Sequence, residues 1–226
     1  MKILEGVNSV KSNSKNSLHQ NSFIIEFWNK IFLILSKISI FYLIKLFKNN
    51  VSYRFVDGWV LFNLIFSIIS SLLTYYLDLP FFLYFFSLYA ALRIFEIIIY
   101  QLNVLIFDPY RAKKKNIKYK IKSAHRMILL LLHNYVEIMF WYSTITVSLL
   151  KLTNHFIQLT WYSYVQANIL CIASLDQSSL LKITTQNINF LSHLAFFAVI
   201  TGLIITIISI TRFINVLPNV EQIEEY

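Results

Sequence analysis

The chain has 226 residues, of which 57% are hydrophobic, 17% are aromatic and only 14% are charged, and its mean hydropathy is +0.60. Soluble domains carry roughly 25% charged residues, so this chain has too little polar surface to coat a globule of its size. The composition excludes an ordinary soluble enzyme, a disordered chain and a secreted disulfide scaffold. The net charge of +9 lies between apolar runs, which indicates membrane topology rather than binding of nucleic acid.

The N-terminal part of the chain is polar and then amphipathic. Residues 1–22 are rich in Asn, Ser and Lys and predict a flexible polar tail. Residues 23–48 predict a basic amphipathic helix, with Glu26, Lys30 and Lys37 on one side and Phe, Ile and Leu on the other. A helix of this kind lies in the membrane interface. The alternative is a membrane span with Lys37 near its middle, which costs about 2.5–3.5 kcal/mol, so we favour the interfacial helix.

Four longer apolar runs predict transmembrane helices, because about 20 apolar residues cross a bilayer core of about 30 Å. A turn at Asp78-Leu79-Pro80 follows the first run, and Asp108-Pro109 is expected to end the second. The expected fold is an all-α integral membrane protein with the interfacial amphipathic helix and four transmembrane helices. The predicted spans are residues 58–77, 81–107, 127–150 and 190–211.

The distribution of lysine and arginine predicts the orientation of these spans. The loop that ends the two-span hairpin 57–126 is strongly basic, whereas the opposite side offers only Lys151 and Lys182. The positive-inside rule then places the loop, both termini and the tail 218–226 in the cytoplasm of a multi-pass cell-membrane protein. The loop also suits anionic lipid headgroups. Its basic residues are Arg111, Lys113, Lys114, Lys115, Lys118, Lys120, Lys122 and Arg126.

Charged residues inside the predicted spans are few. Arg93 and Glu96 lie in the second span, and His133 and Glu137 lie in the third. At about 1.5 Å per residue, the two glutamates lie within about 2 Å of the same depth, and Arg93 lies about one turn deeper. Because an unpaired arginine in hydrocarbon is costly, we expect Arg93 to pair with one of the glutamates. Such a cluster serves either as a structural clamp between the spans or as a charge-sensing or ion-relay group.

No motif for catalysis is present. His133 and Glu137 at spacing i,i+4 fit two ligands of a metal site, but no third ligand is evident. The sequence contains no nucleophile triad, zinc-protease motif, glycine-rich phosphate loop or cysteine cluster. We therefore expect no catalytic residue, no cofactor and no enzymatic activity.

The segment between the last two spans, residues 152–189, is long and half apolar. A helical stretch is expected at about 157–173, and a Ser/Thr/Gln-rich stretch follows it. A span, a half-helix, a polar loop and a second span are arranged in this order in the pore module of tetrameric cation channels, where the re-entrant backbone lines water. The alternative is a cap helix and a loop outside the membrane.

The C-terminal half, about residues 127–220, resembles the two-span pore domain of bacterial potassium-channel-like proteins. The stretch GLIITIISITRFINVLP, from Gly202 to Pro218, is similar to their inner pore helix, and Gly202 would match their gating-hinge glycine. The stretch RIFEIIIYQLNVLIFDPYR looks like the span before the pore in relatives of this group. The resemblance implies a pore-domain-like module over residues 127–217 and a homotetramer.

The selectivity filter of that family is absent in its usual form. The segment SLDQSSLLKITTQN falls where the family carries its filter, and alignment on Ser174 puts Lys182, Ile183 and Thr184 at the glycine-containing positions. Potassium filters need a backbone conformation that glycine allows, and Lys182 would place a cation in the ion path. The resemblance implies a pore entrance that includes Ser174, Lys182, Thr184 and Thr185.

Three outcomes stay open for such a chain: a channel of altered selectivity, a non-conducting subunit, or a pore scaffold that binds a partner. The expected function is a cation (potassium)-channel-like membrane protein. The alternative is a non-catalytic membrane interaction protein, such as an immunity or accessory factor for a membrane-active partner.

Overall fold

The computed structural model describes residues 23–39, 52–117, 124–184 and 188–214, and within these ranges the chain is helical without any strand. The four long helices are α4 (Tyr53–Tyr76), α5 (Pro80–Leu102), α7 (Ala124–Leu152) and α10 (Asn189–Ile214). The shorter elements are α2 (Phe23–Leu35), η1 (Ser36–Ile38), η2 (Asn103–Phe107), α6 (Asp108–Lys114), α8 (Trp161–Ala173) and α9 (Ser178–Leu181).

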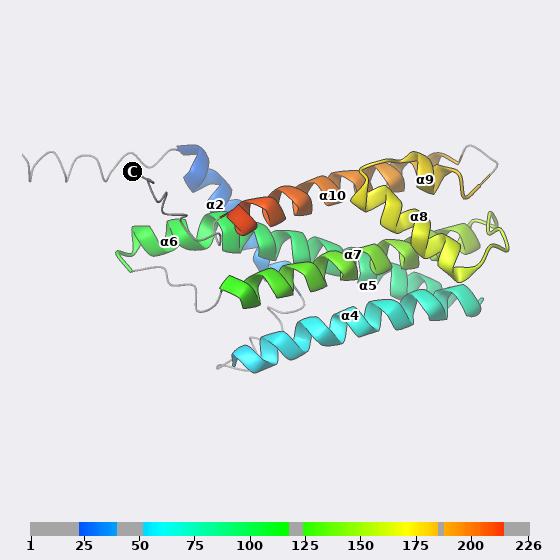
Figure 1. Ribbon diagram of the computed structural model, residues 1–226, viewed down its shortest axis with the longest axis horizontal. Coiled ribbons are helices and arrows are strands. Elements are labelled where there is room, and N and C mark those ends of the chain that lie inside the picture. The colour runs from blue at the N-terminus through cyan, green and yellow to red at the C-terminus, as the bar shows by residue number, and fades with distance from the viewer. Residues whose placement is uncertain (1–22, 40–51, 118–123, 185–187, 215–226) are drawn as a thin grey trace, which may run out of the picture.

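The prediction of four spans and of a multi-pass membrane protein is confirmed. Four helical stretches are long and apolar enough to cross a membrane. In the bundle, α7 packs against α4, α5 and α10, and the start of α4 lies at the same end as the end of α10 (Figure 1). The four stretches are Arg54–Tyr76, Pro80–Lys114, His125–Leu152 and Asn189–Ile214.

A short connection joins α4 to α5 at the other end of the bundle. Pro80 begins α5, where a proline loses no helical hydrogen bond. The last carbonyls of α4 are bound from outside the helix, because Lys151 Nζ donates to the carbonyls of Tyr75 at 2.6 Å and Leu77 at 3.1 Å. The same ammonium lies 2.6 Å from Asp78 Oδ1. One lysine of α7 thus ties the end of α4 and the turn to the third span.

The predicted end of the second span at Asp108-Pro109 is wrong. The five-residue π-helical turn η2 follows α5, and α6 continues directly from it through the basic segment. Pro109 lies in the first turn of α6, where its missing N–H is tolerated, and the wider π turn separates it from the regular ladder of α5. Arg111 stabilises this arrangement with bonds to Asn103 Oδ1 at 2.9 Å and Asp108 Oδ1 at 2.8 Å.

The helix predicted over 23–48 is not continuous within its described part, residues 23–39. Helix α2 ends at Leu35, η1 adds one 3-10 turn, and Ser39 is extended. Helix α2 contacts the basic end of the bundle, since Glu26 Oε1 lies 2.9 Å from Lys114 Nζ and the rings of Phe32 and Phe107 are 4.7 Å apart. Its polar side therefore meets α6, and no residue of α2 is buried. Its position in a membrane interface stays a prediction.

Some predictions concern residues outside the described ranges. These are the tail 1–22, the stretch 40–48, Thr185, the loop lysines Lys118, Lys120 and Lys122, and the C-terminal residues 215–226.

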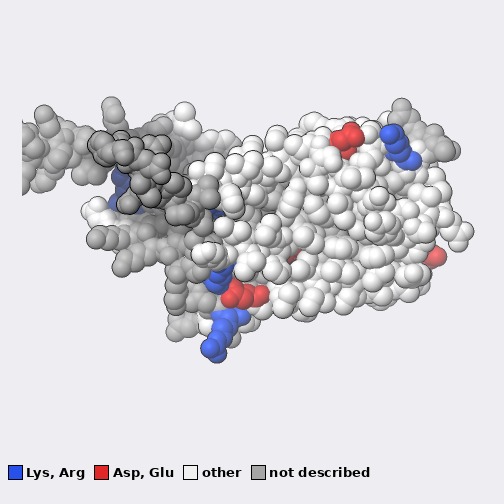
Figure 2. All heavy atoms as spheres, viewed as in Figure 1, with Lys and Arg blue, Asp and Glu red and all other residues white. Residues whose placement is uncertain are grey.

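The described charges gather mainly at one end of the bundle. Figure 2 shows one face of the molecule, on which few charged groups interrupt the uncharged surface of the long helices. At the end where α4 begins and α10 finishes, the described basic residues are Lys30, Lys37, Arg54, Arg111, Lys113, Lys114, Lys115, Arg126 and Arg212. At the opposite end they are Lys151 and Lys182. This asymmetry is the one on which the predicted orientation rests.

Candidate functional site

Helix α8 leaves one end of the bundle and runs back along it. Thr160 forms its N-cap, where the side-chain oxygen accepts from the Ser163 backbone N–H at 3.2 Å. The helix starts later than predicted, because residues 157–160 are not helical. Part of this stretch is held by α4, because the Tyr75 hydroxyl donates to the Leu159 carbonyl at 2.7 Å. Figure 1 shows α8 crossing α7 and α10 obliquely.

The C-terminus of α8 packs against the middle of α10. A Cβ atom built on Gly202 would lie 2.3 Å from the carbonyl oxygen of Ile172 and 3.1 Å from Leu175 Cδ2. Glycine is therefore required at this position for close approach of two backbones. The structure therefore shows a packing role for Gly202, and its action as a gating hinge stays a prediction.

The contact with Gly202 fixes how deep α8 reaches. The hydroxyls of Tyr142 on α7 and Thr201 on α10 are 2.8 Å apart, so these two residues share one level. From Lys151 to Tyr142, α7 advances about 13–14 Å at about 1.5 Å per residue. Half of a bilayer core is about 15 Å. If Lys151, which pairs with the exposed Asp78, marks one boundary of the core, α8 ends near its centre.

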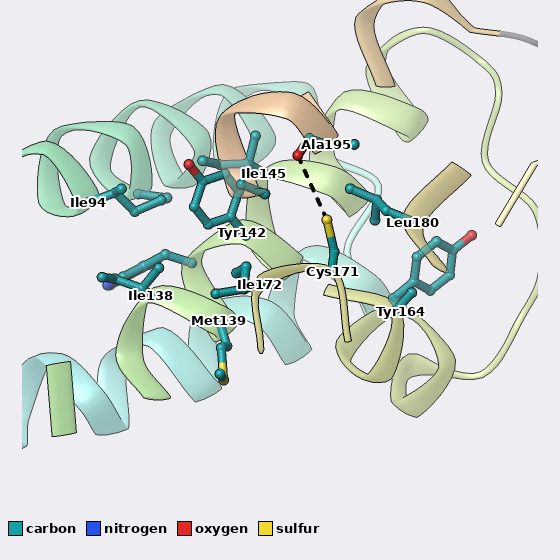
Figure 3. Close-up of a cluster of buried hydrophobic side chains, with 14 of the residues drawn as sticks. Ile94, Ile138, Met139, Tyr142, Ile145, Tyr164, Cys171, Ile172, Leu180 and Ala195 are labelled. Atoms are coloured by element: carbon teal, nitrogen blue, oxygen red, sulfur yellow. Dashed lines mark hydrogen bonds between the residues drawn. The ribbon is translucent and has the colours of Figure 1, made fainter. Parts of the chain in front are cut away.

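Helix α8 is held in place by buried side chains. Cys171 and Ile172 are fully buried among residues of α7 and α10, and Cys171 Sγ lies 3.8 Å from the Ala195 carbonyl oxygen (Figure 3). A buried hydrogen bond of 3.1 Å joins Thr146 Oγ1 of α7 to Asn168 Oδ1 of α8. This packing makes α8 an integral part of the bundle.

The residues after α8 form an exposed, non-helical turn. Ser174, Leu175 and Asp176 are exposed, and Leu175 adopts a left-handed backbone with φ of 56°. The Asp176 carboxylate accepts bonds from the backbone N–H of Ser178 at 2.9 Å and from its hydroxyl at 2.5 Å. Asp176 makes no ion pair with any described residue. An exposed carboxylate thus follows directly on the residue that contacts Gly202.

The predicted entrance residues lie in different surroundings. Ser174 is exposed at the end of α8, and Lys182 is exposed at the end of α9. Ile183 and Thr184 are 7% and 9% exposed, so their side chains do not face an open path in the single chain. Thr185 lies outside the described residues.

The second candidate site is the buried ion-pair cluster between α5 and α7. Arg93 lies 2.7 Å through Nε and 3.2 Å through Nη2 from the two carboxylate oxygens of Glu137. Its Nη1 donates to Glu96 Oε2 at 2.8 Å. Both partners considered from the sequence are therefore bound at once, and the three side chains are 5% exposed or less. The cluster joins two spans and contains two carboxylates for one guanidinium.

Neighbouring groups complete this cluster. Trp141 Nε1 donates to Glu137 Oε1 at 2.9 Å, and the Ser39 hydroxyl bonds to Glu96 Oε1. The guanidinium carbon of Arg93 lies 5.9 Å from the centre of the Trp59 ring. His133 lies elsewhere, since its Nδ1 is 2.7 Å from the Leu129 carbonyl oxygen of its own helix.

The described residues contain no group of three His, Cys, Asp or Glu side chains that would hold a metal ion. The ion pairs of Arg93 within α5 and with Glu137 of α7 hold these two spans together. Sequence reasoning missed Ser39, Asn134, Trp141 and Asp176. Of these four, Trp141 could most readily have been predicted from the sequence, because it stands four residues after Glu137 on the same helical face.

Comparison with known proteins gives no relative from which a function could be transferred. No family model, no curated protein and no solved structure matches the chain.

Proposed function

We propose that the chain is a subunit of a cation-channel-like membrane protein whose pore is built by residues 127–217 from several copies, with a homotetramer as the expected assembly. The observation that carries this proposal is the exposed turn at Ser174–Asp176, which follows α8 beside Gly202 in the middle of α10.

A turn of this kind needs water or protein around it. Irregular backbone within the hydrocarbon region is tolerated only where it is buried in protein or lines a water-filled cavity. A charged aspartate at the centre of a bilayer costs about 2.5–3.5 kcal/mol on insertion scales. Asp176 and its neighbours are exposed in the single chain, so a second copy or an aqueous pore has to cover them.

The charge of the turn favours cations. The carboxylate of Asp176 stands three residues beyond the last residue of α8, whose C-terminal carbonyls carry the negative end of the helix dipole. Copies arranged around an axis would bring these negative groups together. A potassium-selective filter is not expected, because Ile183 and Thr184 are buried and Lys182 is exposed at the positions of the filter glycines.

A surface for contact between copies is available on α10. Eight large apolar side chains of this helix are 36–61% exposed, and six of them follow one another at alternating spacings of four and three residues. This alternation is typical of helices that pack at a small angle with side chains interdigitated. We assign the stripe to packing against α10 of a second copy. Its members are Phe196, Ile200, Leu203, Ile207, Ile210 and Ile214.

The proposed orientation puts the end where α4 begins in the cytoplasm, because most described Lys and Arg residues lie there. Helix α2 would then lie on the cytoplasmic surface, with its exposed Phe23, Ile24 and Ile34 in the lipid interface. The turn at Ser174–Asp176 would be reached from the outer side.

The test is ion flux through liposomes that contain the purified chain. We expect cation flux above that of empty vesicles, and a loss of preference for cations over anions in Asp176→Asn. The matched control is Asp78→Asn, which removes a carboxylate that is 83% exposed at the end of the bundle. Neutralising Lys182 should raise cation flux. Flux no higher than in empty vesicles would refute conduction.

A measurement of stoichiometry distinguishes the channel subunit from the alternative function as an interaction protein. Native mass spectrometry of the chain in detergent should give a homotetramer. A single heterologous partner bound at one-to-one stoichiometry, together with absent flux, would instead support the non-catalytic interaction protein, such as an immunity or accessory factor.

A further inference from the structure

Helix α2 lies antiparallel to the end of the second span, at the basic end of the bundle (Figure 1). Three contacts run in opposite order along the two segments. They are Glu26 with Lys114 at 2.9 Å, Asn29 with Arg111 at 3.3 Å, and Phe32 with Phe107 at 4.7 Å between ring centres. The contacts on α2 recur every three residues, as along one side of a helix. The side of α2 that meets the bundle is therefore largely polar.

The opposite side of α2 is apolar and exposed. Ile24, Phe27 and Ile34 share this side of the helix and are 63%, 49% and 62% exposed. An amphipathic helix of a soluble protein turns its apolar side to the core. Helix α2 has the reverse orientation, so its apolar side needs a cover other than water. Hydrocarbon at a membrane interface supplies such a cover.

The position of α2 along the second span fits this cover. The ring of Phe32 lies against Phe107, which ends the apolar part of the stretch Pro80–Lys114. Six residues before Phe32, Glu26 contacts Lys114 in the basic segment that follows. Helix α2 therefore lies where hydrocarbon gives way to lipid headgroups.

Excess positive charge borders the apolar side of α2. Lys30 follows Glu26 by one helical turn, and Lys113 and Lys115 flank Lys114 in the sequence. These three lysines are exposed, and none of them forms an ion pair with a described residue. Three cations thus surround the Glu26–Lys114 pair, which is already neutral.

The same end of a second copy would not neutralise these cations. The solvent-accessible carboxylates that the structure describes there are each in an ion pair of their own chain. These carboxylates are Glu26, Asp57 and Asp108. A second copy would therefore present like charges to the lysines. A phospholipid with a negative headgroup offers both an opposite charge and hydrocarbon chains.

We propose that α2 and the C-terminal end of α6 bind the headgroup of an anionic phospholipid, whose acyl chains cover the apolar side of α2. Lys30, Lys113 and Lys115 pair with the phosphate. A cation near an anionic membrane surface strengthens binding about fivefold, which corresponds to about 1 kcal/mol. The site rests on the placement of α2 under the proposed function, whose lipid partner it names, and it does not require conduction.

The test is native mass spectrometry of the purified full chain in detergent. The probes are dioleoyl phosphatidylglycerol and dioleoyl phosphatidylcholine, which share their acyl chains and differ in headgroup charge. We expect the affinity for phosphatidylglycerol to be at least about tenfold higher, as two or more lysine contacts require. Glycerophosphoglycerol, which is the same headgroup without chains, should not bind at the same concentration, because it gains nothing from the apolar side of α2.

Single lysine variants locate the headgroup. Lys30→Gln and Lys113→Gln should each lower the affinity for phosphatidylglycerol about fivefold and leave that for phosphatidylcholine unchanged. The matched control is Lys37→Gln, which removes another exposed lysine of the same segment. Lys37 lies about 16 Å along the chain from Glu26, beyond the Debye length of about 10 Å at 0.1 M salt, so the control should keep the affinity.

A second measurement locates the acyl chains. Trp28 on α2 is 47% exposed, and the difference in fluorescence between the chain and Trp28→Phe reports on this residue alone. In nanodiscs of phosphatidylcholine, a small fraction of phosphatidylglycerol with brominated chains should quench this signal. The same fraction of brominated phosphatidylcholine should quench it less, because it is not concentrated beside α2.

Equal affinity for the two lipids would overturn the proposal, since the lysines would then be neutralised within the chain or by a second copy. Equal quenching by the two brominated lipids would overturn it as well. Equal losses in Lys37→Gln and Lys113→Gln would show diffuse attraction to the basic end in place of a site. Absence of ion flux has no bearing on these results, and loss of the lipid preference leaves the proposed conduction untouched.

Discussion

Replacement of Gly202 by alanine tests whether this glycine is required for packing. The added Cβ would lie 2.3 Å from the Ile172 carbonyl oxygen and 3.1 Å from its carbonyl carbon. Carbon–oxygen contacts normally lie at about 3.3–3.6 Å, so α8 and α10 must move apart by about 1 Å. Both obstructing atoms belong to the backbone, which cannot rotate away as a side chain does. Overpacking of this kind costs about 1–3 kcal/mol.

The second helical glycine of the spans supplies the matched control. A Cβ built on Gly58 in α4 meets no atom within 4 Å. Gly58→Ala should therefore stabilise the chain by the difference in helix propensity, about 0.5–1 kcal/mol. Gly202→Ala gains the same helix propensity but also introduces the clash with the Ile172 carbonyl. The difference between the two variants isolates the packing contribution of about 1–3 kcal/mol.

The assay is reversible unfolding in mixed micelles with an increasing fraction of sodium dodecyl sulfate, followed by circular dichroism. Gly202→Ala is expected to be less stable than Gly58→Ala in this assay. Equal stability of the two variants would refute the reasoning from close approach. A hinge role for Gly202 would then be the better explanation, and it would be detected as altered flux without altered stability.

Three further outcomes are expected. Glu137→Gln should lower the free energy of unfolding by about 1.5–3 kcal/mol, because the bonds of Arg93 to the Glu137 carboxylate are weakened while Glu96 still pairs with the guanidinium, and the same detergent titration measures this; a loss below about 1 kcal/mol would contradict the clamp. Lys151→Met should lower it by about 1–3 kcal/mol, since two terminal carbonyls of α4 lose their donor, whereas Lys182→Met, at an exposed position, should have no measurable effect on stability. The hydrogen bond and charge of the lysine partner on α6 lower the pKa of Glu26 below its ordinary 4.5, so the contribution of this ion pair to the attachment of α2 is complete above about pH 4.5 and is lost as the pH falls through the lowered value. Hydrogen exchange of the α2 amides measured against pH checks this, and Glu26→Gln should abolish the dependence; a pH dependence that persists in the variant would assign it to another group.

The four spans were predictable because each is a run of about 20 apolar residues, and this signal is local. The partners of Arg93 were predictable for a similar reason. Counting residues from the ends of two neighbouring spans gives relative depth, and an arginine inside a span requires an acceptor. The sequence could not decide between Glu96 and Glu137, because the geometry of the guanidinium fork allows both bonds together.

Features that depend on contacts between distant segments escaped prediction. The proline at position 109 predicts a break, yet the π turn before it allows the helix to resume, and no residue type marks a π turn. Helix α2 ends at Leu35, and four residues later Ser39 bonds to Glu96, which lies 57 positions further along the chain. The half-helix α8 was expected, but the level it reaches follows from the contact with Gly202.

The bridge formed by Arg93 has a consequence for how the chain enters a bilayer. On α5, the guanidinium and the Glu96 carboxylate stand at spacing i,i+3 and travel together as a neutral pair. The Glu137 carboxylate on α7 has its counter-ion on another helix. Synthesis from the N-terminus delivers α5 first, so the Glu137 carboxylate of α7 enters a bilayer that already contains its guanidinium partner. A rearranged chain in which α7 preceded α5 would have to insert an uncompensated acid, and its membrane integration should fail more often.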